Sequence, residues 1–367
     1  MRFTFLFIIF ISLSSHAQNR ELSVLTCGPG TELYSTFGHS AFRLKDTSRG
    51  IDRVYNYGMF DFRTEGFYLK FVQGKLPYML GAYDYSHFYR SYSQEGRWIK
   101  EQKLDLTQEE LNQIVSFLNH NATGDNRFYM YDFFKDNCAT KIAEVLNKNL
   151  DRPVNFNFNF FKSEDTYRTL LHGKLENKPW SKFGIDLALG SLIDKDLNPQ
   201  DHQFLPDYLM QSFNGSEVAG EPKTLLNEKI EEQKSLISSP YLIFLGLLIL
   251  GILWTYFSLS PVYFDLPLFF TVAVIGIILL FLWFGTDHYA TKMNWNILWL
   301  SPIPLIAYFR KNKFLVHLSI GLMILCLVLD IIGAQVLPEG SYFLMSIMSL
   351  RLLERTYDLS KLKRASS

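Results

Sequence analysis

The sequence predicts an α+β extracytoplasmic domain followed by an all-α transmembrane bundle of about five helices. Three observations lead to this fold class. The N-terminus has the pattern of an export signal, and residues up to about Lys234 mix alternating and helical apolar patterns. Beyond Lys234 the chain is dominated by apolar runs long enough to cross a bilayer. The formal net charge of its 367 residues is zero, which gives no reason to expect nucleic acid as a partner.

Residues 1–17 are predicted to be a signal peptide. Arg2 supplies the positive charge, residues 3–13 the apolar core, and Ser15-His16-Ala17 a small-x-small cleavage site. An uncleaved anchor is the alternative, although the apolar core is short for a membrane span. We therefore expect residues 18–238 to form a domain in the periplasm of a two-membrane bacterium.

Two alternating stretches on either side of the turn at residues 46–50 predict a β-hairpin. A turn centred on residues 48 and 49 pairs Arg43 with Val54. His39 and Asn56 then become diagonal neighbours on one face of the sheet. A slip of one residue would send them to opposite faces, and a histidine that only bonds a backbone carbonyl is the alternative for His39.

A helix is expected to begin at Asp136-Asn137-Cys138, with Asp136 as the N-cap and Cys138 at the second helical position. Ile142 and Leu146 share the face of Cys138, and the pattern ends near residue 149. The positive end of a helix dipole lowers the pKa of a thiol and favours the thiolate. A small buried hydrophobe is the alternative, but an upstream strand histidine favours a nucleophile.

The other segments predict supporting structure. Residues 60–81 suggest a strand and a helix over the sheet, residues 97–106 a strand, and residues 107–110 a capping box that opens a helix to about residue 119. Three cysteines are too few for a disulfide scaffold, and no zinc or phosphate-binding motif is present. Four histidines in polar or loop contexts are expected at the surface: His87, His120, His172 and His202.

The C-terminal part, residues 239–357, is expected to be the transmembrane domain. The predicted spans are residues 241–259, 266–285, 295–309, 314–333 and 342–353, of which the third is weak because it contains two prolines. The basic segments 310–313 and 361–364 should both be cytoplasmic, and five spans satisfy this whereas four do not. Residues 358–367 are therefore expected to be a cytoplasmic tail.

This topology puts residues 286–296 on the outer face, beneath the N-terminal domain. Asp287 and His288 would lie at head-group level. The segment is either a polar interfacial loop anchored by Tyr289 and Trp295 or a contact with a lipid head group or the domain above it. Arg351, in the last span, either extends to the cytoplasmic surface or pairs inside the bundle.

A strand histidine that precedes a cysteine at a helix start reverses the order of papain and resembles the permuted, NlpC-type papain-like fold. A closer resemblance rests on residues 35–43, 54–62 and 131–140. The segments 204–209 and 286–296 extend it into the membrane part. These strings resemble the Lnb-type family.

The resemblance implies a lipoprotein N-acyltransferase of the Bacteroidota type, in the inner membrane. Together with the residues, it implies that Cys138 takes an acyl chain from a phospholipid as a thioester and passes it to the N-terminal amine of a diacylglyceryl-cysteine lipoprotein. His39 is expected to be the general base and Asn56 the residue that orients its ring. Neither a metal nor an organic cofactor is expected. The residues expected to contact substrate are Asp287, His288, Asn137 and Tyr131.

Two other classes stay open on the sequence. A membrane-anchored cysteine peptidase or amidase acting on cell-wall peptides could use the same Cys–His pair, and it would need a wide, polar cleft. The Phe-rich content and the several spans favour lipid instead. A non-catalytic envelope protein with a Cys27–Cys138 disulfide is the third class, since the periplasm permits that bond.

Overall fold

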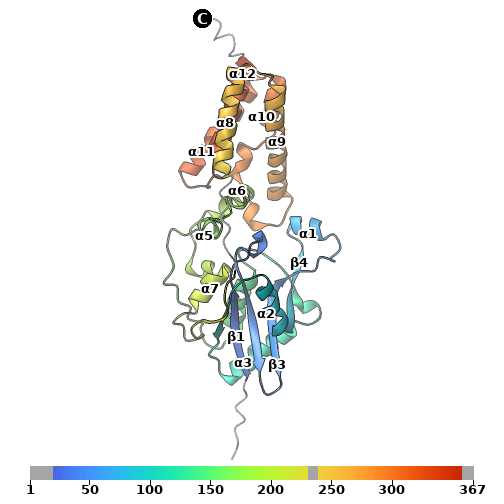
Figure 1. Ribbon diagram of the computed structural model, residues 1–367, viewed down its shortest axis with the longest axis vertical. Helices are drawn as coiled ribbons and strands as arrows, with labels where there is room; N and C mark the ends of the chain where they lie inside the picture. Colours follow the sequence, from blue (N-terminus) through green and yellow to red (C-terminus); the bar gives the residue numbers. More distant parts are fainter. Residues whose placement is uncertain (1–19, 230–238, 358–367) are drawn as a thin grey trace, which may run out of the picture.

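The computed structural model describes residues 20–229 and 239–357. The predicted signal peptide and basic tail lie outside the described residues. The chain forms an α+β part and a helical part that follow one another along the long axis of the molecule, with α5 and α6 lying between them (Figure 1). The predicted fold class, a mixed α+β domain followed by a helical region, is therefore confirmed.

The α+β part is built on one antiparallel sheet of seven strands in the order β6-β4-β3-β2-β1-β5-β7. The predicted hairpin is β2 and β3, and Arg43 lies opposite Val54 as expected. On its other side β2 pairs with β1, where His39 lies opposite Cys27. The strands are β1 Arg20–Cys27, β2 His39–Asp46, β3 Ile51–Met59, β4 Pro77–Asp84, β5 Ile99–Lys103, β6 Phe128–Met130 and β7 Lys223–Leu226.

Helices cover both faces of this sheet. On one face α3 (Gln108–Asn121) and α4 (Cys138–Asn149) pack against a buried apolar cluster that includes Phe42 and Tyr55. On the other face α2 (Tyr85–Gln94) inserts Phe88 between strand residues. The predicted capping box at the start of α3 is present. Both faces are therefore buried, and the ends of the strands are left to form a site.

The helix expected over the sheet between residues 60 and 81 is in a different place. It is α1 (Phe67–Gln73), and it lies beside the end of α9 (Figure 1). Phe67 is buried, but the other large apolar side chains of α1 are exposed. The helix therefore does not bury an apolar face on the strands. The prediction was wrong because α2, an aromatic helix not expected from the sequence, covers that face.

A second layer of short helices separates the sheet from the bundle. It contains α5 (Tyr167–Lys174) and α6 (Pro179–Ala188), whereas α7 (Pro206–Ser212) lies beside the sheet and packs against α4 and β1 (Figure 1). Two of the four predicted surface histidines, His87 and His120, are exposed. The others are bound within this layer: His202 is fully buried and its Nε2 lies 3.0 Å from Asp165 Oδ2, while His172 Nε2 lies 2.8 Å from Asp186 Oδ1. Their polar neighbours in sequence concealed these tertiary partners.

The C-terminal part is a helical bundle. Within the described residues, α9 and α11 are long and apolar enough to cross a membrane by themselves, and α8 is apolar but shorter. The predicted span 295–309 is α-helical only from Ile303, with Pro302 as the N-cap, and residues Trp295–Leu298 form a short 3-10 helix. The helices are α8 Pro240–Tyr256, α9 Val262–Phe284, α10 Ile303–Arg310, α11 Lys313–Ile331 and α12 Ser341–Tyr357.

Segment 286–296 connects the two parts. The Ala290 carbonyl accepts from Gly190 N–H (2.8 Å), and the side-chain amide of Asn294 donates to the Leu187 carbonyl (2.8 Å). A Cβ at Gly190 would lie 2.0 Å from the Lys292 carbonyl oxygen, so only glycine permits this approach. The segment is therefore in contact with the domain above it, one of the two alternatives expected from the sequence.

Arg351 pairs inside the bundle and does not extend to the surface. Its Nε donates to Asp265 Oδ1 (2.6 Å) and its Nη1 to Thr255 Oγ1 (2.6 Å) and to Glu354. Arg351 is 2% exposed and Asp265 0%. A buried charge of this kind is tolerated only with its partners in place.

We expect Arg351→Leu to destabilise the protein by about 3–5 kcal/mol, because Asp265 would remain buried without its partner. The double variant Arg351→Leu/Asp265→Leu should recover most of that loss, since neither charge is left. Thermal unfolding in detergent measures both. A double variant no more stable than the single one would contradict this account of the pair.

Candidate active site

The start of α4 places the cysteine. The expected N-cap, Asp136, is wrong by one residue: Asn137 is the N-cap and Cys138 is the first helical residue. Asn137 has an extended backbone, and its side-chain oxygen accepts from the N–H groups of Ala139 (2.8 Å) and Thr140 (3.0 Å). Asp136 instead forms an ion pair with Lys141 (2.7 Å). Both residues are good N-caps by type, and tertiary contacts decide between them.

The Asn137 side chain has no capacity left for a ligand. Its amide nitrogen donates to the carbonyls of Phe133 (2.7 Å) and Phe204 (2.8 Å), which uses both N–H groups. Asn137 therefore fixes the helix start against two other segments. Within the described residues no group accepts from the Cys138 N–H, so this donor at the positive helix end is free for a ligand.

His39 is the first residue of β2 and meets Asn56 of β3 as the hairpin register predicted. Its Nε2 lies 2.5 Å from Asn56 Oδ1, and Asn56 Nδ2 donates to the hydroxyl of Tyr83 (2.8 Å). A carbonyl oxygen only accepts, so Nε2 carries a proton and donates to Asn56. The other ring nitrogen, Nδ1, is then the one available to the thiol.

Cys138 and His39 come together across Gly58. A Cβ at Gly58 would lie 3.7 Å from Cys138 Cβ and 4.0 Å from His39 Cε1. The φ of Gly58 is +89°, in the left-handed region that favours glycine. The thiol and the imidazole are close enough that each shifts the pKa of the other. The three predicted catalytic residues thus meet in space, although they come from three separate elements.

Electrostatics favour a charged pair. Burial alone would raise the pKa of the Cys138 thiol, but the His39 ring and the N–H groups of Ser40 and Ala139 outweigh it and lower the pKa. Burial alone would lower the pKa of His39, but Cys138 and Asn56 outweigh it and raise the pKa. Both directions favour a thiolate beside an imidazolium.

Tyr131 lies next to this pair. Its ring stacks on Tyr78, with centroids 4.3 Å apart and planes at 18°. Burial, and then the neighbouring Cys138, raises the pKa of Tyr131 well above its usual value. Its hydroxyl therefore keeps its proton at neutral pH, and the residue lines the same cavity as Cys138.

A cavity of about 1020 Å³ contains the site. His39, Cys138, Asn137 and Tyr131 line it together with His288 of the membrane part, whereas Asp287 is not among its lining residues. Its walls come from both halves of the chain and are largely apolar. The apolar lining residues include Leu33, Phe37, Phe60, Phe71, Leu76, Phe133, Phe134, Leu171, Trp180, Ile185 and Phe204.

The two candidates from segment 286–296 therefore differ. His288 Nε2 lies 3.1 Å from the Phe71 carbonyl, so its ring links α1 to the end of α9 while facing the cavity. Asp287 is exposed, and its carboxylate lies 4.0 Å from Lys75. The wall from α1 was not identified from the sequence, whereas residues 183–192, which overlap α6, were expected either to cover a hydrophobic substrate or to be ordinary core.

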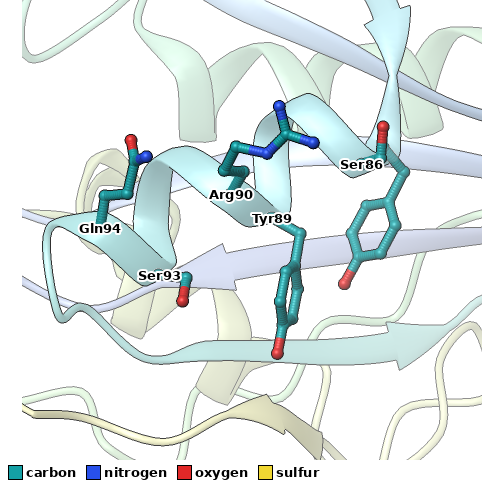
Figure 2. Close-up of a pocket in the computed structure, with 6 residues that line it drawn as sticks. Ser86, Tyr89, Arg90, Ser93 and Gln94 are labelled. Carbon is teal, nitrogen blue, oxygen red and sulfur yellow. The ribbon is translucent and has the colours of Figure 1, made fainter.

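A second pocket, about 600 Å³, lies on the outer face of α2 (Figure 2). Ser86, Tyr89, Arg90, Ser93 and Gln94 line it with Tyr85, and it contains no cysteine or histidine. Among the residues that the structure describes, no cluster of three or more His, Cys, Asp or Glu side chains could hold a metal ion. The cavity at Cys138 is therefore the candidate active site.

A thiol at a helix start, an imidazole on a preceding strand and an amide in contact with its ring are the groups that thiol enzymes use. Comparison with protein families identifies the family of the chain. Residues 12–173 match the Lnb N-terminal periplasmic domain, and residues 231–362 match the Lnb transmembrane domain. The chain therefore belongs to the Lnb family. Comparisons with curated proteins and with solved structures gave no match.

The three cysteines are free thiols, so Cys27 and Cys138 are not joined in the structure. Burial raises the pKa of Cys27 far above its usual value, which keeps it protonated and unreactive. Cys138 is only partly buried and faces the cavity. The two thiols should thus differ sharply in reactivity.

We expect iodoacetamide to label Cys138 at neutral pH, with a rate that falls only as the pH drops below the lowered thiol pKa. In His39→Ala the imidazole no longer lowers the pKa of the Cys138 thiol, while burial still raises it. Labelling should therefore shift to alkaline pH. Peptide mass spectrometry over a pH series measures this, with Cys138→Ser as the blank. Protection of both Cys27 and Cys138 until a reductant is added would instead support the disulfide.

Asn56→Ala should slow labelling of Cys138 at neutral pH, but less than His39→Ala, because water can replace part of the hydrogen bond to the ring. Tyr83→Phe is the matched control, since it removes one hydroxyl and leaves the contact between His39 and Asn56. The same pH series measures all three variants. A silent Asn56→Ala would mean that this amide does not orient the imidazole.

Proposed function

We propose that this protein is a lipoprotein N-acyltransferase that uses Cys138 as its nucleophile. The observation that carries the proposal is the Cys138–His39 pair, which lies in a largely apolar cavity walled by both the α+β part and the membrane part. An acyl chain needs apolar walls, and a thiolate needs a nearby imidazole. Family membership supports an enzyme of this kind.

In the first half-reaction the Cys138 thiolate attacks an ester carbonyl of a membrane phospholipid. The carbonyl carbon forms a bond to sulfur and its bond to the glycerol oxygen breaks. The His39 imidazolium gives its proton to the leaving oxygen, so lysophospholipid departs as an alcohol. The product on the enzyme is an acyl thioester.

In the second half-reaction the α-amine of a diacylglyceryl-cysteine attacks the thioester carbonyl. Neutral His39 takes a proton from the amine as the C–N bond forms. The C–S bond then breaks, which returns the thiolate beside the imidazolium. The acceptor leaves as an amide, and atoms and charges balance over the two steps.

Two groups would stabilise the oxyanion that forms in each step. The free N–H of Cys138 lies at the positive end of α4, where a developing negative charge is favoured. Tyr131 lines the same cavity and its hydroxyl stays protonated, so it is the second donor to the substrate in this proposal. Asn56 holds the His39 ring so that Nδ1 faces the thiol.

We place the protein in the inner membrane as a multi-pass protein, with the catalytic domain in the periplasm. Both proposed substrates are lipids of the outer leaflet, and anchoring the site at that surface raises their effective concentration. The basic residues Arg310 and Lys313 mark the junction of α10 and α11, at the end of the bundle away from the α+β part. That distribution agrees with a cytoplasmic location of this end.

A peptidase or amidase acting on cell-wall peptides is the alternative. It would require a wide, polar cleft for a hydrated peptide, whereas the cavity around Cys138 is lined largely by apolar and aromatic side chains. The structural-disulfide alternative needs Cys27 and Cys138 to be joined, and both are free. Lipid acyl transfer is the function that the site supports best.

Incubation with phospholipid and no acceptor should trap the acyl form, because the second step lacks its amine. Mass spectrometry should show a fatty-acyl increment on the peptide containing Cys138, and neutral hydroxylamine should remove it. A diacylated lipopeptide with a free α-amine should discharge the adduct.

The matched control is the same lipopeptide with its amine blocked, which should leave the adduct in place. A peptidyl adduct formed from cell-wall peptide would support the peptidase instead. Absence of any adduct in an active preparation would overturn the thioester mechanism.

A further inference from the structure

We propose that α1, with the preceding residues Phe60 and Phe62, is inserted into the interfacial region of the bilayer and forms the lipid-facing edge of the cavity. The partner is the membrane surface itself. This inference deepens the proposed function, because it specifies the route by which an acyl chain enters. Its first test measures membrane depth and does not depend on activity.

The first observation is the composition of the exposed surface of α1. Tyr68 is 77% exposed, Leu69 61% and Phe71 50%, although a short helix of a water-soluble surface normally exposes polar residues. Phe62 adjoins them and is 69% exposed. Large apolar side chains gathered in one exposed patch mark an interaction site.

The patch has a rigid base. The Phe67 ring is buried beneath it and packs against the rings of Phe60 (5.7 Å between centroids) and Phe62 (4.8 Å). The Phe71 ring stacks one turn further along, 6.4 Å from Phe67. The exposed side chains are thus held in place by an aromatic cluster and are not the loose side chains of a mobile loop.

The second observation is the level at which α1 lies. The Gln73 carbonyl accepts from Asp287 N–H (2.8 Å), and the Phe71 carbonyl contacts His288 Nε2 (3.1 Å). Asp287 follows directly after the apolar helix α9, which ends at Phe284, and Figure 1 shows α1 beside that end. The end of a membrane-spanning helix lies at the head-group level, so α1 lies there too.

The third observation is that the patch continues into the cavity. Phe60 and Phe71 belong both to the exposed surface and to the cavity lining. Tyr34, Trp180 and Tyr289 also line the cavity and are exposed by 40% or more, and the Trp180 ring packs against Phe244 of α8 (5.9 Å). An acyl chain could therefore pass from the bilayer to Cys138 along apolar side chains without crossing water.

Charge agrees with a lipid partner. Lys70 lies within α1 and Lys75 follows it, where their ammonium groups can reach phosphate oxygens of head groups. Aromatic rings with polar tips, such as Tyr68, are favoured at this depth. A second protein on the patch would also bury these residues, and the experiment below distinguishes it.

The test places a nitroxide spin label at residue 69 in the full-length protein in lipid nanodiscs. The variant is Leu69→Cys/Cys138→Ser, in which the other cysteines, Cys27 and Cys326, are buried. Collision rates with oxygen, which concentrates in lipid, and with a water-soluble nickel complex report the surroundings of the label. Thr47→Cys/Cys138→Ser, at the exposed turn between β2 and β3, is the aqueous control, and Ile278→Cys/Cys138→Ser on α9 is the lipid control.

The proposal expects the label at residue 69 to collide frequently with oxygen and rarely with nickel, as at residue 278. Frequent nickel collisions, as at residue 47, would mean that α1 stands in water and would overturn the proposal. Protection from both reagents would mean that protein covers the patch and would overturn it equally.

A second measurement links the patch to the proposed reaction. Leu69→Asp should slow acylation of Cys138 by long-chain phospholipid in membranes, while a short-chain donor in detergent should still acylate it, because that donor need not leave a bilayer. Thr47→Asp is the matched control. Loss of acylation with both donors would indicate that Leu69→Asp is misfolded. The spin-label measurement, made on a different variant, then decides the proposal. If the wild-type protein forms no acyl adduct, the proposed function fails while the depth measurement still decides the position of α1.

Discussion

The position of the reactive thiol depends on the side chain of Asn137. Its two acceptor bonds hold the first turn of α4, and its two donor bonds reach Phe133 and Phe204. One buried amide thus joins the catalytic helix to the layer that contacts the membrane part. Because all four bonds are directional, they fix where the helix begins as well as which way it points. The free N–H of Cys138 is a consequence of that helix start, whereas the lowered pKa of its thiol comes mainly from His39.

The rest of the site follows from the sheet. The hairpin brings His39 and Asn56 to the end of the strands where α4 begins, and Gly58 leaves room for the thiol and the imidazole to approach. The membrane part supplies the remaining wall through His288. Neither half of the chain forms the cavity alone, so the cavity requires both the α+β part and the bundle.

Local signals predicted part of this arrangement. The turn fixed the hairpin register, so the contact between His39 and Asn56 was predictable, and the helix after Cys138 followed from apolar periodicity. The N-cap was missed because adjacent Asp and Asn have similar capping preferences and distant carbonyls choose between them. The burial of His202 was missed because it depends on Asp165, and the place of α1 because periodicity does not distinguish a protein core from a bilayer.

The hydrogen bonds between segment 286–296 and residues 187–191 have a geometric consequence. The close approach at Gly190 and these hydrogen bonds hold the α+β part against the bundle. These contacts then set the height of Cys138 above the bilayer. A sulfur at fixed height meets only those carbonyl groups that lie at the matching depth in a lipid. For the proposed acyl transfer, the distance of an ester from the membrane midplane would then decide whether it reaches Cys138.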